Sequence, residues 1–312
     1  MPGERVLVTG GCGFIGSTLV PLLLERSAQV RILDNLVAGG PEPPAQAELT
    51  VGDVRNPEDV ERAARDCDAI IHLAAAGNVP DSISDPVANF EVNARGTLNV
   101  LRAAVDAEVG RLVFASTGGA LIGAAEPPVD EDSVPRPLSP YGASKLAGEG
   151  YLHAFRGSYG LDAVALRFGN VYGPHSAHKK GAVTMFIKRS LRGEPLVIYG
   201  DGSASRDFIH VRDLCDGILA GLDAPAPPAV VHLASGRETP IRRLAELILR
   251  ATGGDVPIEH RPARAGEVER NVAATALASE ALGFTARVEL RDGLAETVQW
   301  FKQTGAWRTG RG

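Results

Sequence analysis

Several features that define other protein classes are scarce or missing in this chain of 312 residues. Three cysteines (Cys12, Cys67 and Cys215) are too few and too widely spaced for a disulfide framework or a metal site, so no metal is expected. No apolar run approaches the roughly 20 residues that span a bilayer, and the first apolar strand begins too early for a signal peptide. We therefore expect a cytoplasmic protein without membrane association, whose cysteines are small buried groups in a reducing compartment.

Positive charge is also in deficit. The 32 Lys and Arg residues face 38 Asp and Glu residues, for a net charge of −6. A general nucleic-acid binder needs a basic footprint, so nucleic acid is excluded as a partner. The remaining composition, 44% hydrophobic and 22% charged, is typical of a globular enzyme with one large domain or two closely joined domains.

Short apolar runs alternate with helical stretches through the first half of the chain. Strands are predicted at 5–9, 30–33, 48–51, 69–73, 111–115 and 163–167, and helices at 16–26, 57–65, 87–107 and 140–159. This alternation predicts an α/β fold, in which a doubly wound parallel sheet is covered by helices on both faces.

After about Asn170 the alternation loosens. Helices are predicted at 182–192, 241–252 and 290–302, and strands at 195–199, 207–210 and 230–233. We expect a larger N-terminal domain over 1–170, which the chain re-enters in parts of 205–240, and a smaller C-terminal portion over 171–312. The ligand crevice should lie between them.

A glycine-rich turn connects the first predicted strand to the first helix. Gly10, Gly13 and Gly16 allow a tight turn, so that backbone N–H groups and the helix N-terminus can approach a pyrophosphate. Asp34 closes the second strand, where a carboxylate can accept both ribose hydroxyls and repel a 2′-phosphate. The turn, strand, helix and carboxylate together predict a Rossmann-like domain that binds NAD rather than NADP.

Tyr141 and Lys145 are four residues apart on a predicted helix, so the phenol and the ammonium share a face. A nearby cation favours the phenolate and makes a tyrosine a usable base near neutral pH. Alone, this spacing would also fit a surface tyrosine and a solvated lysine. Beside a dinucleotide site, it favours proton and hydride transfer.

At this point the sequence resembles the extended short-chain dehydrogenase/reductases, in particular their NAD-dependent sugar-nucleotide epimerase/dehydratase branch. The resemblance covers nearly the whole chain and is carried by ordered motifs: Val8-Thr-Gly-Gly-Cys-Gly-Phe-Ile-Gly16, Asp34-Asn-Leu36, Gly52-Asp-Val54, His72-Leu-Ala-Ala75, Asn93-x-x-Gly-Thr97, Ser116-Thr117, Tyr141-x-x-x-Lys145, Arg167-x-x-Asn-Val-Tyr-Gly-Pro174 and Arg206-Asp-Phe-Ile-His210.

The resemblance implies a set of site residues. The NAD site would comprise Gly10, Gly13, Phe14, Ile15, Asp34, Asn35, Gly39, Asp53, Val54, Leu73, Ala74, Ala75, Asn93, Tyr141, Lys145, Phe168 and Val171. A UDP-sugar would contact Thr117, Gly118, Gly119, Tyr141, Asn170, His178, Val183, Val197, Tyr199, Arg206, Arg264 and Glu267. The two arginines can present planar forks to diphosphate oxygens, although surface ion pairs are the simpler use of an arginine. Tyr199 can flank the uracil or serve as a core aromatic.

The segment after Thr117 indicates the reaction. Family members that eliminate water carry an Asp-Glu pair here, and those that decarboxylate carry a nearby glutamate, whereas this chain has Gly118 and Gly119 and no carboxylate until Glu126. The resemblance therefore implies inversion at C4, with Thr117, Tyr141 and Lys145 as the catalytic group. Thr117 would orient the C4 oxygen, unless it only closes the strand.

A basic run suggests the sugar. His175, His178, Lys179 and Lys180 can supply charge-assisted hydrogen bonds to a C6 carboxylate, although such a run also fits a solvated loop. UDP-glucuronic acid, giving UDP-galacturonic acid, is the favoured substrate, followed by UDP-glucose and UDP-galactose and then an N-acetylated UDP-hexose. A non-catalytic sensor of NAD or nucleotide sugar is the alternative from another class. A homodimer is expected from the resemblance.

Overall fold

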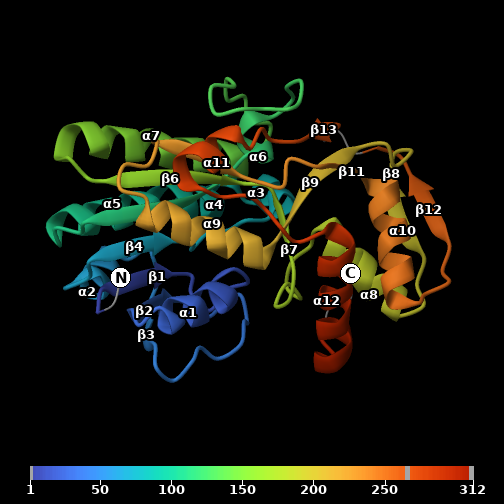
Figure 1. The fold of residues 1–312 in the computed structure, drawn as a ribbon, viewed down its shortest axis with the longest axis horizontal. Helices are drawn as coiled ribbons and strands as arrows, with labels where there is room; N and C mark the ends of the chain where they lie inside the picture. Colours follow the sequence, from blue (N-terminus) through green and yellow to red (C-terminus); the bar gives the residue numbers. More distant parts are fainter. Residues whose placement is uncertain (1–2, 264–267, 309–312) are drawn as a thin grey trace.

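A sheet of seven parallel strands is the centre of the computed structural model, which describes residues 3–263 and 268–308 (Figure 1). The spatial order is β10-β6-β5-β4-β1-β2-β3. The strands are β1 (Arg5–Thr9), β2 (Gln29–Asp34), β3 (Glu48–Val51), β4 (Ala69–His72), β5 (Arg111–Thr117), β6 (Ala163–Phe168) and β10 (Val230–Leu233). The order reverses between β1 and β4, which confirms the predicted doubly wound, Rossmann-like α/β fold.

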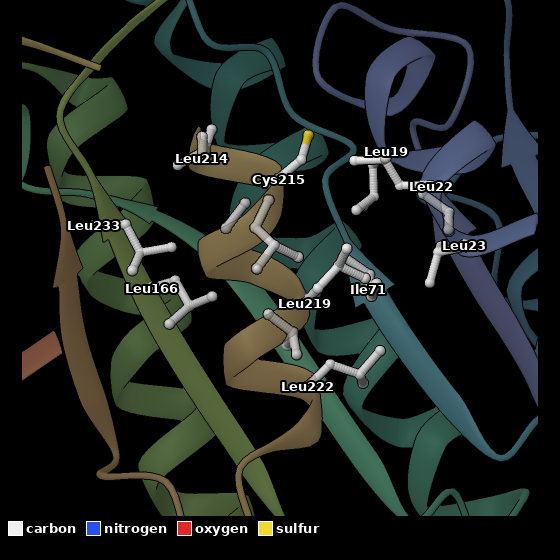
Figure 2. Close-up of a cluster of buried hydrophobic side chains, with 14 of the residues drawn as sticks. Leu19, Leu22, Leu23, Ile71, Leu166, Leu214, Cys215, Leu219, Leu222 and Leu233 are labelled. Atoms are coloured by element: carbon white, nitrogen blue, oxygen red, sulfur yellow. The ribbon is translucent and has the colours of Figure 1, made fainter. Parts of the chain in front are cut away.

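Helices cover both faces of this sheet (Figure 1). One face carries α1 (Gly16–Glu25), α9 (Val211–Asp223) and α11 (Ala276–Leu282), and the other carries α2 (Pro57–Ala64), α5 (Gly96–Asp106) and α7 (Pro140–Tyr159). Figure 2 shows the first of these cores, where leucines of α1 and α9 point at Ile71, Leu166 and Leu233 of the sheet. Each fully buried leucine stabilises the fold by about 1.5–3 kcal/mol.

Helix α9 is absent from the sequence prediction. Leu214, Ile218 and Leu222 recur every four residues and are buried, but Gly217 and Gly221 dilute the helical signal. The glycines are there for packing, since a Cβ on Gly217 would stand only 2.8 Å from a methyl carbon of Leu233. The close approach of α9 to the sheet therefore depends on residues that weaken its sequence pattern.

The helix predicted at 87–107 is interrupted. It consists of α4 (Pro86–Phe90), a π-helical turn η1 (Glu91–Arg95) and α5. The extra residue in the turn brings Asn93 inward, where its side chain is fully buried. Such π turns inside helices are frequent at functional sites.

The C-terminal portion surrounds a separate hydrophobic core between α8 (Ala182–Leu191), α10 (Ile241–Thr252) and α12 (Leu290–Thr304). Its strands are β7 (Asn170–Tyr172), β9 (Ser205–His210), β11 (Glu238–Pro240) and β13 (Arg270–Asn271) in one small sheet, and β8 (Leu196–Tyr199) with β12 (Ile258–Arg261) in another. Two short helices, α3 (Val79–Ser84) and α6 (Gly119–Ile122), follow β4 and β5. Across the described ranges, every helix is too short or too polar to cross a membrane.

Candidate active site

The glycine turn between β1 and α1 is shaped for a close ligand. Gly10 has a φ of +71°, and a Cβ on it would stand 2.8 Å from the backbone nitrogen of Ala74. A Cβ on Gly16 would overlap the backbone of Gly11. No side chain caps α1 at its N-cap residue Ile15, and the N–H groups of Ser17 and Thr18 already bond to the carbonyls of Gly13 and Ile15, so a phosphate would be held by N–H groups earlier in the turn.

Asp34 is buried at the end of β2 and ties that strand to the glycine turn. One carboxylate oxygen accepts the backbone N–H of Cys12 at 2.9 Å, and the other accepts that of Leu36 at 2.7 Å. Burial and the nearby Asp34 charge raise the pKa of the Cys12 thiol to about 11, so the cysteine stays neutral. The turn and the carboxylate are thus held as one unit, as an adenosine ribose site requires.

The other residues predicted for the cofactor also follow the carboxyl ends of the sheet strands. Asn35 and Gly39 are exposed after β2, and the Asn35 amide donates to Asp53 at 3.0 Å. A hydrogen bond from Arg55 holds the pKa of Asp53 well below its usual range. The remaining members are Phe14 and Ile15 in the glycine turn, Val54 after β3, Leu73, Ala74 and Ala75 after β4, Phe168 at the end of β6 and Val171 on β7.

Asn93 connects the segment after β4 to helix α7. Its carbonyl oxygen accepts the N–H of Ala76 at 2.8 Å, and its amide donates to the hydroxyl of Ser144 at 3.0 Å. Beneath it, the ring of His72 bridges the hydroxyls of Thr9 (2.6 Å) and Thr97 (3.0 Å). These buried links fix the segment after β4 against helix α7, close to Tyr141 and Lys145.

Helix α7 presents Tyr141 and Lys145 to the end of β5. Ser139 caps the helix by accepting the N–H of Gly142, and Pro140 occupies the first turn, so Tyr141 comes at the start of the helix. The hydroxyl of Tyr141 is hydrogen-bonded to Thr117 at the end of β5. The three predicted catalytic residues are therefore neighbours across the β5–α7 junction.

The pKa values of Tyr141 and Lys145 differ from the sequence expectation that the tyrosine is easily deprotonated beside a charged lysine. Burial raises the pKa of Tyr141 to about 12, and the hydrogen bond with Thr117 only partly opposes this. The ammonium of Lys145 donates to the carbonyl of Ala115 at 2.8 Å and lies 4.8 Å from the centre of the Phe114 ring. Burial lowers the pKa of Lys145 to about 7, a nearby Glu149 opposes that shift, and a nearby Lys179 adds to it.

A buried ion pair lies directly behind the catalytic residues. Arg167 of β6 donates to both carboxylate oxygens of Glu149 on α7, at 3.0 and 2.9 Å, and Ser116 donates to the same carboxylate at 2.5 Å. Both charged side chains are less than 10% exposed. Sequence reasoning did not single out Glu149, although its position four residues after Lys145 was the available signal.

The glycines after Thr117 are covered by side chains from elsewhere in the fold. A Cβ on Gly118 would stand 3.2 Å from Nδ1 of His232 on β10, and a Cβ on Gly119 would overlap the amide of Asn271 on β13. Related dehydratases are expected to carry an acid and a base at these two positions. In this chain, the space that those side chains would occupy is filled by a neutral imidazole and an amide. Burial lowers the pKa of His232 to about 4. Asn271 is a site residue that no sequence signal indicated.

The residues predicted for the UDP-sugar are distributed over the C-terminal portion. Asn170 and His178 are exposed on β7 and in the following loop, and Val183 is buried in α8. Val197 and Tyr199 are on β8, and Arg206 of β9 is in register with Asn271 of β13. Arg264 and Glu267 lie outside the described residues. Within the described ranges, no group of three or more His, Cys, Asp or Glu side chains is placed to hold a metal.

A doubly wound sheet with a glycine turn of the dinucleotide-binding kind and a tyrosine–lysine pair beside it is typical of enzymes that use a nicotinamide dinucleotide. The model of the NAD dependent epimerase/dehydratase family matches residues 6–234. The UDP-glucose 4-epimerase of Mycolicibacterium smegmatis is 36% identical over 308 residues, 96% of this chain and 98% of that protein. This chain belongs to the NAD dependent epimerase/dehydratase family, and its cofactor is NAD.

Solved structures agree with this assignment. The UDP-glucose 4-epimerase of Thermotoga maritima with UDP-glucose has a TM-score of 0.93 at 34% identity, over 96% of this chain and 99% of that one. MoeE5 in complex with UDP-glucuronic acid and NAD has a TM-score of 0.89 at 33% identity, over 96% of this chain and 100% of that one.

Proposed function

We propose that this enzyme is a UDP-sugar 4-epimerase, which inverts C4 of the hexose through a transient 4-keto intermediate. The observation that carries the proposal is the group of Thr117, Tyr141 and Lys145 next to two glycines whose side-chain space is already filled. Without an acid and a base at 118 and 119, elimination across C5 and C6 has no catalyst. The names of the relatives from M. smegmatis and T. maritima support the same reaction.

In this mechanism Tyr141 takes the proton of the C4 hydroxyl and later returns it. Thr117 orients the C4 oxygen, and the Lys145 ammonium stabilises the phenolate. NAD held at the carboxyl ends of the sheet strands would supply the hydride chemistry at C4, and its positive charge would favour the Tyr141 phenolate that burial alone disfavours. The residues at the carboxyl ends of the sheet strands hold NAD. Asn170, Val197, Tyr199 and Arg206, together with Arg264 and Glu267, hold the nucleoside diphosphate.

UDP-glucose and UDP-galactose are the proposed substrate and product. The basic run that favoured a uronate in the sequence is dispersed in the fold. Lys180 forms an exposed ion pair with Asp81 at 2.9 Å, His175 packs against Trp300, and His178 is exposed in the loop. Lys179 is the member of this run whose charge lowers the pKa of the catalytic lysine. It favours UDP-glucuronic acid as a second substrate, a choice supported by the ligand of MoeE5.

The test is to incubate the purified protein with UDP-glucose and, separately, with UDP-glucuronic acid, without added NAD, and to resolve the C4 isomers by chromatography. Interconversion is expected because NAD is regenerated in each turnover. Tyr141→Phe should lower turnover by at least about 10³-fold while NAD stays bound. Tyr172→Phe is the matched control, since it removes a buried hydroxyl that has no hydrogen-bond partner among the residues that the structure describes. Bound NAD without conversion of any UDP-sugar would favour the non-catalytic sensor.

We further propose that the enzyme is a homodimer in a reducing compartment such as the cytoplasm. Helices α3, α4 and α7 pack together and expose Ile83 (61%), Val87 (69%), Phe90 (55%) and Tyr151 (43%), a surface that a second copy can cover. The three cysteines are buried and unpaired with one another. Light scattering that shows a monomer at working concentration would contradict the proposed homodimer.

A further inference from the structure

The loop between β7 and α8, residues 173–181, is held at both ends. The hydroxyl of Ser176 donates to the carbonyl of Gly173 at 2.7 Å. Lys180 forms its ion pair with Asp81 on α3, the short helix after β4. Lys179 lies between these two attachment points, so its backbone position is defined by its neighbours.

The ammonium of Lys179 lies next to the segment that follows β4. Its Nζ lies 3.7 Å from the point where a Cβ on Gly77 would stand. Gly77 belongs to the segment after β4 that also contains Leu73, Ala74 and Ala75. The ammonium is also close enough to Lys145 to lower the pKa of that residue. It is therefore near both the segment expected to line the cofactor site and the catalytic lysine.

This cation has no counter-ion in the described part of the chain. The nearby carboxylates are engaged by other groups, since Asp81 pairs with Lys180 and Glu149 pairs with Arg167. Burial lowers the pKa of the Lys179 ammonium. A partly buried charge without a partner is costly, and the cost is offset when an anionic group of a ligand binds beside it.

The position of Lys179 indicates which anionic group that is. Tyr141 and Lys145 act at C4 of the hexose, and a carboxylate at C6 is attached to C5, the neighbouring carbon. The phosphates of NAD are expected at the N-terminus of α1, and those of UDP beside Arg206 on β9. We propose, on the basis of the proposed function, that Lys179 binds the C6 carboxylate of a UDP-hexuronate, so that the enzyme epimerises UDP-glucuronic acid as well as UDP-glucose.

The ion pair between Lys179 and the C6 carboxylate would also suppress a side reaction. The 4-keto form of a hexuronate is a β-keto acid. It loses carbon dioxide when the bond between C5 and C6 is parallel to the π orbital of the C4 ketone. An ammonium that holds the carboxylate in one orientation keeps that bond out of alignment while the hydride returns to C4. The product is then the C4 epimer with all six carbons retained.

The experiment compares Lys179→Met with wild type on both sugars, measuring kcat/KM for UDP-glucuronic acid and UDP-glucose together with NAD content. At about pH 6, below the pKa of Lys145, loss of a charge-assisted contact should lower kcat/KM for UDP-glucuronic acid by about 10- to 100-fold, with UDP-glucose changed by less than about threefold. Lys302→Met is the matched control, because this exposed lysine of α12 donates to the carbonyl of Thr252 in the C-terminal portion and holds no part of the 173–181 loop. It should leave the ratio between the two sugars unchanged.

The outcomes separate this inference from the proposed function. A wild-type enzyme that converts UDP-glucose but not UDP-glucuronic acid would overturn the inference alone. An equal loss on both sugars in Lys179→Met, or loss of NAD, would overturn it as well, because Lys179 would then bind a group that both reactions share. Conversion of neither sugar by wild type would overturn the proposed function and the inference together.

Discussion

The amide of Asn271 lies against Gly119 so closely that a Cβ at position 119 would overlap it. Asn271 comes from β13, which is paired with β9, while Gly119 begins α6 two residues after Thr117. This contact joins the C-terminal portion to the catalytic turn. It also prevents position 119 from carrying the side chain that an elimination reaction would need.

Gly119→Ala should therefore destabilise the protein, by about 1–3 kcal/mol, because the new methyl group displaces Asn271 or the turn. Replacing Asn271 with glycine in the same chain should restore most of the loss, since the overlap is then relieved. Urea unfolding of both variants measures the effect. Gly150→Ala on α7, where a Cβ meets nothing within 4 Å, is the control and should be neutral or slightly stabilising. Equal stability of Gly119→Ala and this control would contradict the packing argument.

The buried pair of Glu149 and Arg167 gives a second prediction. Glu149→Gln leaves the guanidinium buried without its counter-charge, so the free energy of unfolding should fall by about 3–5 kcal/mol. Asp223→Asn removes the partner of Arg26 in an exposed ion pair and should cost less than about 1 kcal/mol. Denaturant titration of the two variants provides the comparison. Similar small losses in both would mean that solvent reaches Arg167.

Local patterns in the sequence were sufficient to predict the strands of the sheet, the glycine turn and the Tyr141–Lys145 pair. Each of these features depends on residues that are close together in the chain. Contacts between distant segments were not predictable in this way. Asn271 lies in a two-residue strand with no periodicity, and α9 is obscured by the glycines that let it pack. The run from His175 to Lys180 looks uniform in sequence, yet only the fold directs Lys179 inward and Lys180 to Asp81.

The pH dependence of kcat/KM should change when Lys179 is replaced by an uncharged residue. The pKa of Lys145 is lowered to about 7, and the reaction needs its charged form, so kcat/KM should fall as the pH rises through that pKa. The groups that shift it are Glu149 on α7, which raises the pKa, and Lys179 on the facing loop, which lowers it. Lys179→Met should therefore move the alkaline limb to higher pH. The profile is measured with UDP-glucose, and an unchanged or acid-shifted limb would refute the coupling.

Asp34 should decide which dinucleotide stays bound. Its two carboxylate oxygens accept N–H groups of Cys12 and Leu36, and an amide can accept only with its single oxygen. Asp34→Asn should thus loosen the turn, lose the charged acceptor for the ribose hydroxyls, and yield protein with much less bound NAD. Removal of the negative charge should also let NADP bind more tightly than it binds to wild type, because a 2′-phosphate is no longer repelled. Bound nucleotide is measured by chromatography after denaturation, with the exposed Asp106→Asn as the control. Wild-type NAD content in Asp34→Asn would show that other groups hold the ribose.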